Sequence, residues 1–427
     1  ETGAEPKSVR SYLDNAFHNL ETEYGIVVRQ ESSLAVRFKN IIEGAYNKTG
    51  QQVAILIDEY DSPLQHSWGT PHHEACTSIY REVFAILKAD DKYEKFVFIT
   101  GITKFTQISL FSVLNNLSNI SFEPEYAAIC GITKEEMLRD FKPEIHKLAE
   151  YERRTFDEAV ALLTAHYDGY HFSHDNMVDV FNPFSLINAL ADSKLRNYWA
   201  SSGATSMLPK FVDNIEIRLK SFENCPIDGD TLETSDVTGG GAELFLYQSG
   251  YLTIKDYQMG VYILGFPNQE VRQALYETVL PALTLRSNSN IQSVQSGLLL
   301  ALQLGNLPEA MKCLKALVAD VPYSNKKLAS MDMEERYRLI LSTIFNAIGC
   351  RVEVEKMIAT GRIDMVVETI HIIYVLKLSN NGGIDAAAEQ IRSRQYAEPF
   401  KADKRRVVAL AIELDDKGKG VIDWKEV

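Results

Sequence analysis

Hydrophobic and polar positions change period several times along the chain, and each change marks a predicted element. Residues 8–47 carry apolar side chains at helical spacing up to a stop at "NKTG". "QVAILIDEY" at 52–60 is a continuous apolar run, typical of a strand buried on both faces of a parallel sheet. A helical stretch at 78–89 and a second apolar run, "KFVFITGIT" at 95–103, follow it. Strand, helix and strand in this spacing predict a βαβ unit.

The rest of the chain reads as helices, then a hairpin, then a mixed domain. Residues 133–200 are mainly helical, and "LFLYQSGYLTIKDYQMGVYILGFPN" at 244–268 alternates as a β-hairpin does. Residues 268–349 return to helical spacing. The last part predicts helices at 334–348 and 384–396, with strands at 351–358, 363–369, 371–378, 405–414 and 420–425. We therefore predict an α/β protein with several units.

Composition narrows the class of protein. The 427 residues are 45% hydrophobic and 24% charged, with a net charge of −14. Residues 331–427 hold 15 Lys and Arg against 16 Asp and Glu, so the acidic excess lies in the first 330 residues. An acidic body repels phosphate backbones, which excludes nucleic-acid binding by the whole surface. No apolar run reaches the roughly 18 residues of a membrane span. Five widely spaced cysteines indicate reduced thiols and a cytoplasmic location.

The first apolar run ends in two adjacent acids, Asp58 and Glu59. P-loop NTPases end a buried strand in this way, using the acids to hold magnesium and to polarise the attacking water. Their phosphates rest in a glycine-rich loop, GxxxxGK(S/T). None of the glycines in the 427 residues belongs to that motif. Without the loop's backbone N–H groups and its lysine, the two acids make a poor ATP site.

Ten ordered stretches resemble those of one known family. They are "VAILIDEYDSPL", "FVFITGITKFTQISLFSVLNNLSNIS", "EYAAICGIT", "YDGYHF", "FNPFSLINAL", "NYWASSGAT", "LYQSGYLTI", "GFPNQEVR", "GRIDMVVET" and "YAEPF". The chain resembles the bacterial AAA-ATPase-like proteins with a C-terminal PD-(D/E)xK nuclease-like domain, which are abundant in Bacteroidetes such as Bacteroides. The resemblance implies an ATPase-like core at 1–132, a helical and winged-helix-like region at 133–267, a helical connector at 268–330 and a restriction-endonuclease-like α/β domain at 331–427.

Members of this family carry their P-loop ahead of the region where this chain begins. The resemblance therefore implies a truncated P-loop NTPase-like parallel sheet, with the magnesium ligand at Asp58, the catalytic base at Glu59 and a sensor position from Thr100 to Lys104. ATP and Mg²⁺ are expected as cofactors only if the P-loop segment is present in the full-length protein. For this chain we favour an inactive remnant, with Asp58 and Glu59 as vestiges of the site.

The nuclease resemblance concerns a second metal site. Such nucleases hold magnesium with an Asp on one strand and the acid of a (D/E)-x-K motif on the next, and the lysine activates the attacking water. "GRIDMVVET" supplies Asp364, and Glu355 and Gln390 also match family positions. These three side chains alone would hold a metal only weakly.

The second half of the nuclease motif is altered. Where relatives read "IYVFEFK" this chain reads "IYVLKLS", which puts Lys377 at the second acid and Ser379 at the lysine. A shifted register would make Lys377 the lysine but would leave Val375 at the acid. A cation at a ligand position repels Mg²⁺. We therefore expect a nuclease-like domain that does not cut, in which Asp364 is vestigial.

Charged residues near the last predicted helix indicate which binding partners the protein could have. A basic cluster surrounds the last predicted helix and comprises Arg392, Arg394, Lys401, Lys404, Arg405 and Arg406. It could face a nucleic-acid backbone, although charge runs are more often solvated surfaces. No membrane partner is expected. Two functions remain: a catalytically silent binding or interaction protein, which we favour, and an ATP-dependent nuclease-type enzyme acting on nucleic acid.

The strand "KFVFITGI" has a further consequence. In P-loop ATPases of this kind the P-loop strand lies beside it, so its absence leaves the edge at Phe96–Ile99 with unpaired backbone groups. An exposed edge is a template for association. We expect self-association or a covering segment.

Overall fold

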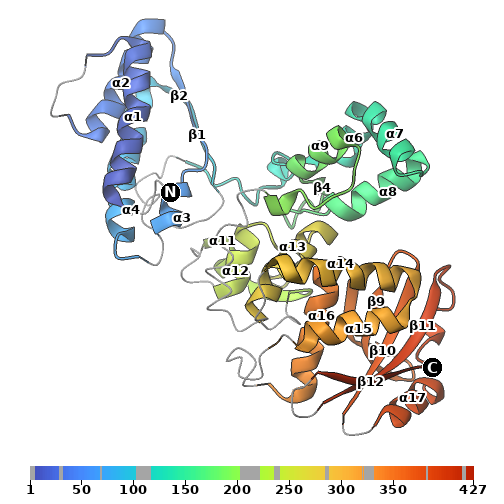
Figure 1. The fold of residues 1–427 in the computed structure, drawn as a ribbon. Helices are drawn as coiled ribbons and strands as arrows, with labels where there is room; N and C mark the ends of the chain where they lie inside the picture. The colour runs from blue at the N-terminus through green and yellow to red at the C-terminus, as the bar shows by residue number, and fades with distance from the viewer. Residues whose placement is uncertain are drawn as a thin grey trace. The chain divides into compact units, whose positions relative to one another are not determined.

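The structure is a computed structural model of the chain (Figure 1). It describes residues 5–27, 32–67, 70–101, 117–201, 222–234, 241–283, 288–319, 321, 331–380, 383–415 and 420–427. The chain divides into two compact units, and each collects segments that are distant in sequence. The first comprises Glu1–Ile129, His171–Val178 and Asn224–Gly265, and the second comprises Cys130–Tyr170, Asp179–Glu223 and Phe266–Val427. None of the described helices is long and apolar enough to cross a membrane.

The N-terminal part of the first unit is a small parallel sheet covered by helices. Its elements are α1 (Pro6–Tyr24), α2 (Leu34–Thr49), β1 (Val53–Ile57), α3 (Ser62–Ser67), α4 (His73–Phe84), α5 (Ile86–Ala89), a 3₁₀ turn (Asp91–Tyr93) and β2 (Glu94–Ile99). Strands β1 and β2 pair in parallel, with Leu56 beside Phe98. This pairing confirms the predicted βαβ unit. The residues of the predicted sensor segment after Gly101, including Lys104, lie outside the described residues.

A buried ion pair fixes α1 against α2. The guanidinium of Arg37 on α2 donates two hydrogen bonds of 2.7 Å to the carboxylate of Glu21 on α1, and Glu21 is buried. The same guanidinium also contacts the side chain of Asp14. These hydrogen bonds, first of all those to Glu21, raise the pKa of Arg37. The rings of Phe17 and Phe38 stack beside this pair with centroids 5.4 Å apart, so the two helices share one apolar seam.

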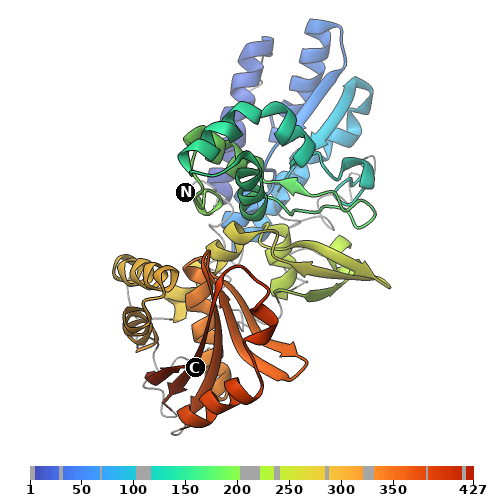
Figure 2. The same ribbon diagram turned by 90° about the vertical axis from the view of Figure 1, so that its right-hand side faces the viewer.

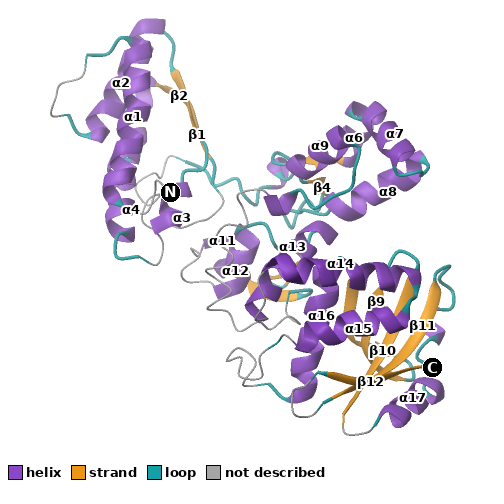
Figure 3. Ribbon diagram, viewed as in Figure 1, coloured by secondary structure: helices purple, strands orange, loops and turns teal. Residues whose placement is uncertain are grey.

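Helices dominate the middle of the chain, as Figure 3 shows in purple. They are α6 (Lys134–Asp140), α7 (Lys142–Tyr151), α8 (Phe156–Tyr167) and α9 (Pro183–Asp192), with a short pair of strands, β3 (Ile132–Thr133) and β4 (Val180–Phe181), and 3₁₀ turns at Pro124–Tyr126 and Trp199–Ser201. Thr133 and Thr155 begin α6 and α8 in capping boxes with Glu136 and Glu158. This confirms the mainly helical reading of residues 133–200.

A strand, two helices and a hairpin form a small three-stranded part of the first unit. The elements are β5 (Cys225–Asp228), α11 (Gly229–Thr234), α12 (Gly241–Gln248), β6 (Thr253–Gln258) and β7 (Val261–Gly265), with the strand order β5-β7-β6. The sequence prediction of a hairpin from residue 244 was wrong for "LFLYQ", which belongs to α12. Leu244, Phe245 and Leu246 are all buried, and a short apolar run of this kind suits a buried helix as well as a strand.

The C-terminal part of the second unit is a five-stranded mixed sheet with helices on both sides. Helices α13 (Gln269–Leu283), α14 (Asn288–Leu304), α15 (Leu307–Ala319) and α16 (Met333–Ala347) precede β8 (Arg351–Ile358), β9 (Gly361–Glu368), β10 (Ile372–Asn380), α17 (Ile384–Ser393), a 3₁₀ turn (Glu398–Phe400), β11 (Arg406–Leu414) and β12 (Val421–Glu426). The strand order is β12-β11-β10-β9-β8. Figure 2 shows α17 packed along this sheet. The α/β fold class predicted from the sequence is confirmed.

Candidate functional site

The acids Asp58 and Glu59 directly follow β1 at the carboxyl end of the parallel pair. One carboxylate oxygen of Asp58 accepts hydrogen bonds from the Thr100 hydroxyl and, at 3.0 Å, from the Glu59 backbone N–H. The backbone of Thr100 extends the pairing of the two strands, because its N–H donates to the Ile57 carbonyl at 2.8 Å. The structure thus brings Asp58, Glu59 and Thr100 together.

Backbone geometry at this corner is unusual. Glu59 has a φ of +49°, a left-handed conformation that costs a non-glycine residue about 1–2 kcal/mol. Gly101 is needed two residues after the end of β2, because a Cβ there would lie 2.6 Å from the Asp61 carboxylate and 2.5 Å from the Tyr60 ring. Strained residues that the surroundings hold in place are commonest at functional sites. Glu59 is exposed to solvent at this corner.

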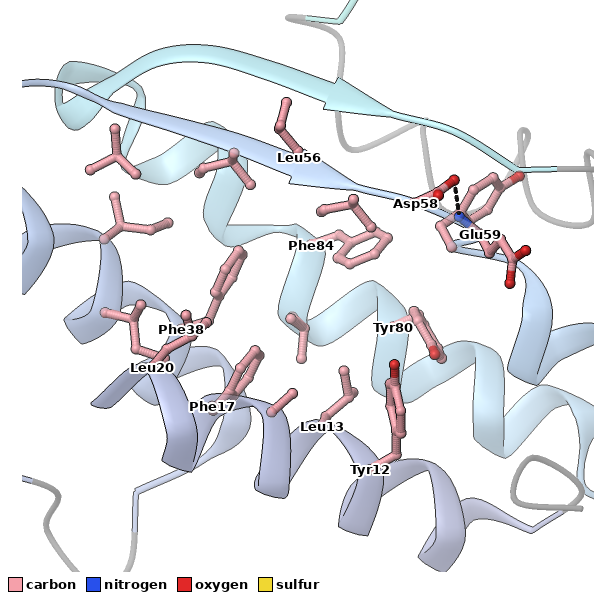
Figure 4. A pocket seen from close by; sticks show the side chains of 18 of the residues that line it. Tyr12, Leu13, Phe17, Leu20, Phe38, Leu56, Asp58, Glu59, Tyr80 and Phe84 are labelled. Carbon is pink, nitrogen blue, oxygen red and sulfur yellow. Dashed lines mark hydrogen bonds between the residues drawn. The ribbon is translucent and has the colours of Figure 1, made fainter. Parts of the chain in front are cut away.

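A cavity of about 590 Å³ extends from these acids along the underside of β1 (Figure 4). Apolar side chains from α1 and α2 point toward the strand, among them Leu13, Phe17 and Phe38, and Asp58 and Glu59 lie at one end. Neither lysine nor arginine is among the described residues that line it. The described lining, which is mainly apolar with carboxylates at one end, therefore supplies neither a lysine nor an arginine to a triphosphate.

The second candidate site lies on β9 and β10 in the C-terminal sheet. The antiparallel register pairs Met365 with Leu376, so Asp364 and Lys377 face each other on adjacent strands. The Lys377 Nζ lies 2.9 Å from Asp364 Oδ1, and the Leu378 backbone N–H donates to Oδ2 at 2.8 Å. Asp364 is 1% exposed. Both carboxylate oxygens are therefore already used by donors from β10.

The other predicted nuclease residues, Glu355 and Gln390, contact partners other than Asp364. Glu355 on β8 has a φ of +54° and lies 2.9 Å from Arg362; it also pairs with Arg338 on α16. Gln390 on α17 donates to the Tyr396 hydroxyl at 3.0 Å. Glu355 and Gln390 are thus not held against Asp364 by any of these contacts. Within the described residues, His, Cys, Asp and Glu side chains form no group of three that could hold a metal.

The residues at this second site do not form a suitable coordination site for Mg²⁺. Magnesium needs oxygen ligands in octahedral geometry, and Asp364 offers its oxygens to an ammonium and an amide instead. Ser379, at the lysine position, donates weakly to the Ile412 carbonyl at 3.4 Å.

The sequence analysis missed Glu413 on β11, a buried carboxylate in register with Ser379. The sequence feature that could have identified Glu413 is its place as the single acid in the apolar run "VVALAIEL".

The basic cluster near α17 is largely matched by acids. Arg405 binds Glu368 and Asp403, each at 2.8 Å, and its hydrogen bonds lower the pKa of Asp403 to about 2. The remaining contacts join Arg392 to Glu389, Arg394 to the Thr360 carbonyl, Lys401 to Glu398 and Arg406 to Glu426. Lys404 is exposed. These ion pairs reduce the field that a nucleic-acid backbone would meet.

Comparison with known proteins addresses the family. Residues 2–111 match a family described as predicted AAA-ATPase, and residues 332–424 match the PD-(D/E)XK nuclease superfamily. An uncharacterized protein in the vnfD 5′ region of Azotobacter chroococcum mcd 1 is 30% identical over 422 residues, which cover 95% of this chain and 77% of that protein. The chain belongs to this AAA-ATPase-like, PD-(D/E)XK nuclease-like family. No solved structure matches it significantly. The assignment to Bacteroidetes stays a prediction.

Membership in the AAA-ATPase-like family makes ATP hydrolysis the first activity to test. We expect the purified 427-residue chain to release no phosphate from ATP with Mg²⁺, because none of its residues form GxxxxGK(S/T) and the described residues that line the cavity beside Glu59 include neither lysine nor arginine. A phosphate-release assay on the wild-type chain and on Glu59→Gln should give the same background rate. Turnover that disappears in Glu59→Gln would show a working site.

Proposed function

We propose that the nuclease-like domain of this chain is catalytically silent and that the chain acts as a binding or interaction protein. One observation carries the proposal: Lys377 Nζ lies 2.9 Å from Asp364 Oδ1, where the nuclease motif would have its second metal ligand. An ammonium ion at this distance neutralises the carboxylate and repels a divalent cation by Coulomb's law. The pair is a structural element of the sheet.

The neighbouring charges support the same proposal. The Glu355 carboxylate is shared between Arg338 on α16 and Arg362 on β9, so two cations occupy it. A nuclease centre needs several oxygen ligands that are free to turn toward one ion. Here Asp364 and Glu355 each have a cationic partner.

The five free thiols support the proposed cytoplasmic location of the protein.

The direct test is plasmid nicking by the full chain with Mg²⁺ or Mn²⁺. The wild-type protein and Asp364→Ala should leave supercoiled plasmid equally intact over hours. Metal-dependent nicking that Asp364→Ala abolishes would overturn the proposal and favour the nuclease instead.

A second candidate function is an ATP-dependent nuclease-type enzyme acting on nucleic acid. The contact of Asp58 with Thr100, at the strand end where P-loop NTPases hold magnesium, favours it. In that case Asp58 would be the metal ligand and Glu59 the base. Nucleic acid would then meet the C-terminal domain near Lys404, an exposed member of the basic cluster.

The binding role that we propose includes self-association through the N-terminal sheet. Among the described strands β2 pairs with β1 alone, so no described strand covers its second edge. Leu56 and Phe96 are 72% and 54% exposed, and the Phe96 ring stacks on Phe98. An open, apolar edge strand favours pairing with a second copy.

We therefore expect the purified chain to sediment as a dimer or larger species. Phe96→Glu should shift it toward the monomer, since a charge on the edge strand disfavours edge-to-edge pairing. Leu300→Glu, at an exposed apolar position on α14, is the matched control and should leave the sedimentation unchanged. A wild-type chain that stays monomeric at high concentration in analytical ultracentrifugation would contradict this expectation.

A further inference from the structure

Strand β1 has a second edge, opposite the edge that pairs with β2. Among the described strands β1 pairs with β2 alone, so no described strand covers this second edge. The Thr100 N–H donates to the Ile57 carbonyl, so the backbone groups of Ile57 point toward β2. Alternate residues of a parallel strand turn their backbone groups to opposite sides, which directs those of Ala54 and Leu56 to the second edge. Both residues are exposed.

The cavity of about 590 Å³ beside Asp58 runs along this second edge. Every residue from 53 to 58 is among those that line it. Side chains of a strand alternate between its two faces, so a cavity over one face would meet every second side chain. Figure 4 shows Leu56 on the opposite side of β1 from Phe17 and Phe38, although all three line the cavity. The cavity therefore follows the backbone edge of the strand.

Helix α1 forms the facing wall of this space, which we call the α1–β1 groove. Its lining residues recur every three or four positions and are Val9, Tyr12, Leu13, Ala16, Phe17, Leu20 and Tyr24. Phe17 and Phe38 are buried in the floor, whereas Tyr12 and Leu20 on the rim are 59% and 36% exposed. Helix α1 rises about 18 Å from Tyr12 to Tyr24, and the five residues of β1 span about 17 Å. The groove thus has the length of a short β-strand.

One end of the α1–β1 groove is acidic. Asp58 and Glu59 directly follow β1 at this end, and both are exposed. The described lining includes neither lysine nor arginine, and its histidine, His66, places Nδ1 2.8 Å from the Ser62 carbonyl. Two neighbouring carboxylates attract a cation. A ligand that complements the whole groove is therefore extended and apolar, with a cationic side chain at one end.

We propose that the α1–β1 groove binds an extended apolar segment of a partner protein, which adds to the second edge of β1 as a further strand. The backbone of the segment pairs with Ala54 and Leu56. Its alternate side chains lie over Phe17 and Phe38, and a terminal lysine or arginine meets Glu59. Main-chain hydrogen bonds supply affinity in such strand addition, and the side-chain contacts supply specificity. This assignment rests on the binding role proposed above.

Fluorescence anisotropy of a labelled peptide mixed with the full chain tests the proposal. The peptide alternates valine with threonine and carries an arginine at each end. It should bind at least about fivefold more tightly than the same peptide with glutamate at each end, because Asp58 and Glu59 attract the first and repel the second. A peptide with proline in place of each threonine should not bind, because proline has no backbone N–H to donate.

Variants of β1 and α1 locate the binding site. Ala54→Pro removes one N–H from the second edge and should weaken binding of the arginine peptide severalfold, whereas the matched control Ala54→Ser keeps the N–H and should bind as the wild type does. Glu59→Lys should remove the preference for arginine over glutamate. Ala16→Trp fills the groove from α1 and should abolish binding, which keeps the test decisive if Ala54→Pro does not fold.

The arginine peptide should leave the sedimentation of the chain unchanged. A peptide that dissociates self-associated chains would make a second copy the occupant and overturn the assignment to a partner protein. Failure of the arginine peptide to bind, equal binding of the proline peptide, or unchanged binding by Ala16→Trp would overturn the strand addition. Plasmid nicking and sedimentation without peptide test the proposed function separately, so either proposal can fail while the other stands.

Discussion

Lys377→Met is expected to lower the free energy of unfolding of the C-terminal domain by about 3–5 kcal/mol, the usual cost of removing one partner of a buried ion pair. The reason lies in Asp364, which is 1% exposed and would keep its carboxylate beside an apolar side chain. The Leu378 N–H at 2.8 Å would remain as its donor and would offset only part of the loss. Urea denaturation followed by circular dichroism measures the change.

An exposed ion pair in the same domain provides the control. Lys425 lies 2.7 Å from Asp385, but their side chains are 46% and 83% exposed, so Lys425→Met should cost less than about 1 kcal/mol. Adding Asp364→Leu to Lys377→Met should recover most of the lost stability, because removing both charges leaves no buried ion. If Lys377→Met cost no more than Lys425→Met, Lys377 would be free to move away from Asp364, and the account of a closed pair would fail.

The double variant Lys377→Glu with Ser379→Lys is expected to create metal-dependent nuclease activity. It supplies an acid opposite Asp364 and a lysine two residues later, on the same face of β10. Together with Asp364 these groups complete the motif that holds Mg²⁺ and activates water. Plasmid nicking should rise at least about hundredfold above the wild-type background, the lower end of what a positioned acid–base group supplies.

Two control variants show whether the gained nuclease activity depends on the altered centre. Asp364→Ala in the double variant should return nicking to background, and Lys425→Glu, which makes the same charge change at the exposed pair, should create no activity. Mn²⁺ should also raise the melting temperature of the double variant, because the ion relieves the repulsion between two neighbouring carboxylates. A folded double variant that neither gains stability with Mn²⁺ nor nicks DNA would show that more than Lys377 and Ser379 silences the domain.

The C-terminal sheet could be predicted from the sequence almost residue by residue. The predicted strand 351–358 has the bounds of β8, and the prediction 371–378 differs from β10 by two residues at most. The reason is local, since each apolar run is closed by glycine, asparagine or charged residues that end a strand. The resemblance to the nuclease motif had placed Lys377 at the second acid position, and the antiparallel register of β9 and β10 puts it opposite Asp364.

Features that depend on tertiary contacts could not be predicted from the sequence. The left-handed Glu355 could not be foreseen, because its conformation accompanies ion pairs with Arg338 and Arg362 from different elements. The helix α12 was taken for a strand, because its apolar run is too short to show a period. The α1–β1 groove likewise forms only when α1 packs beside the strand. Such contacts join residues that no local pattern connects.

The most direct measurement is Mn²⁺ binding to the purified full chain, followed by electron paramagnetic resonance of the free ion. If the ammonium of Lys377 closes the Asp364 centre, wild-type protein and Asp364→Ala should leave the same concentration of free Mn²⁺, whereas Lys377→Glu with Ser379→Lys should bind one additional ion per chain. One Mn²⁺ bound by the wild-type chain and lost in Asp364→Ala would contradict the account, because the centre would then hold metal in spite of its lysine.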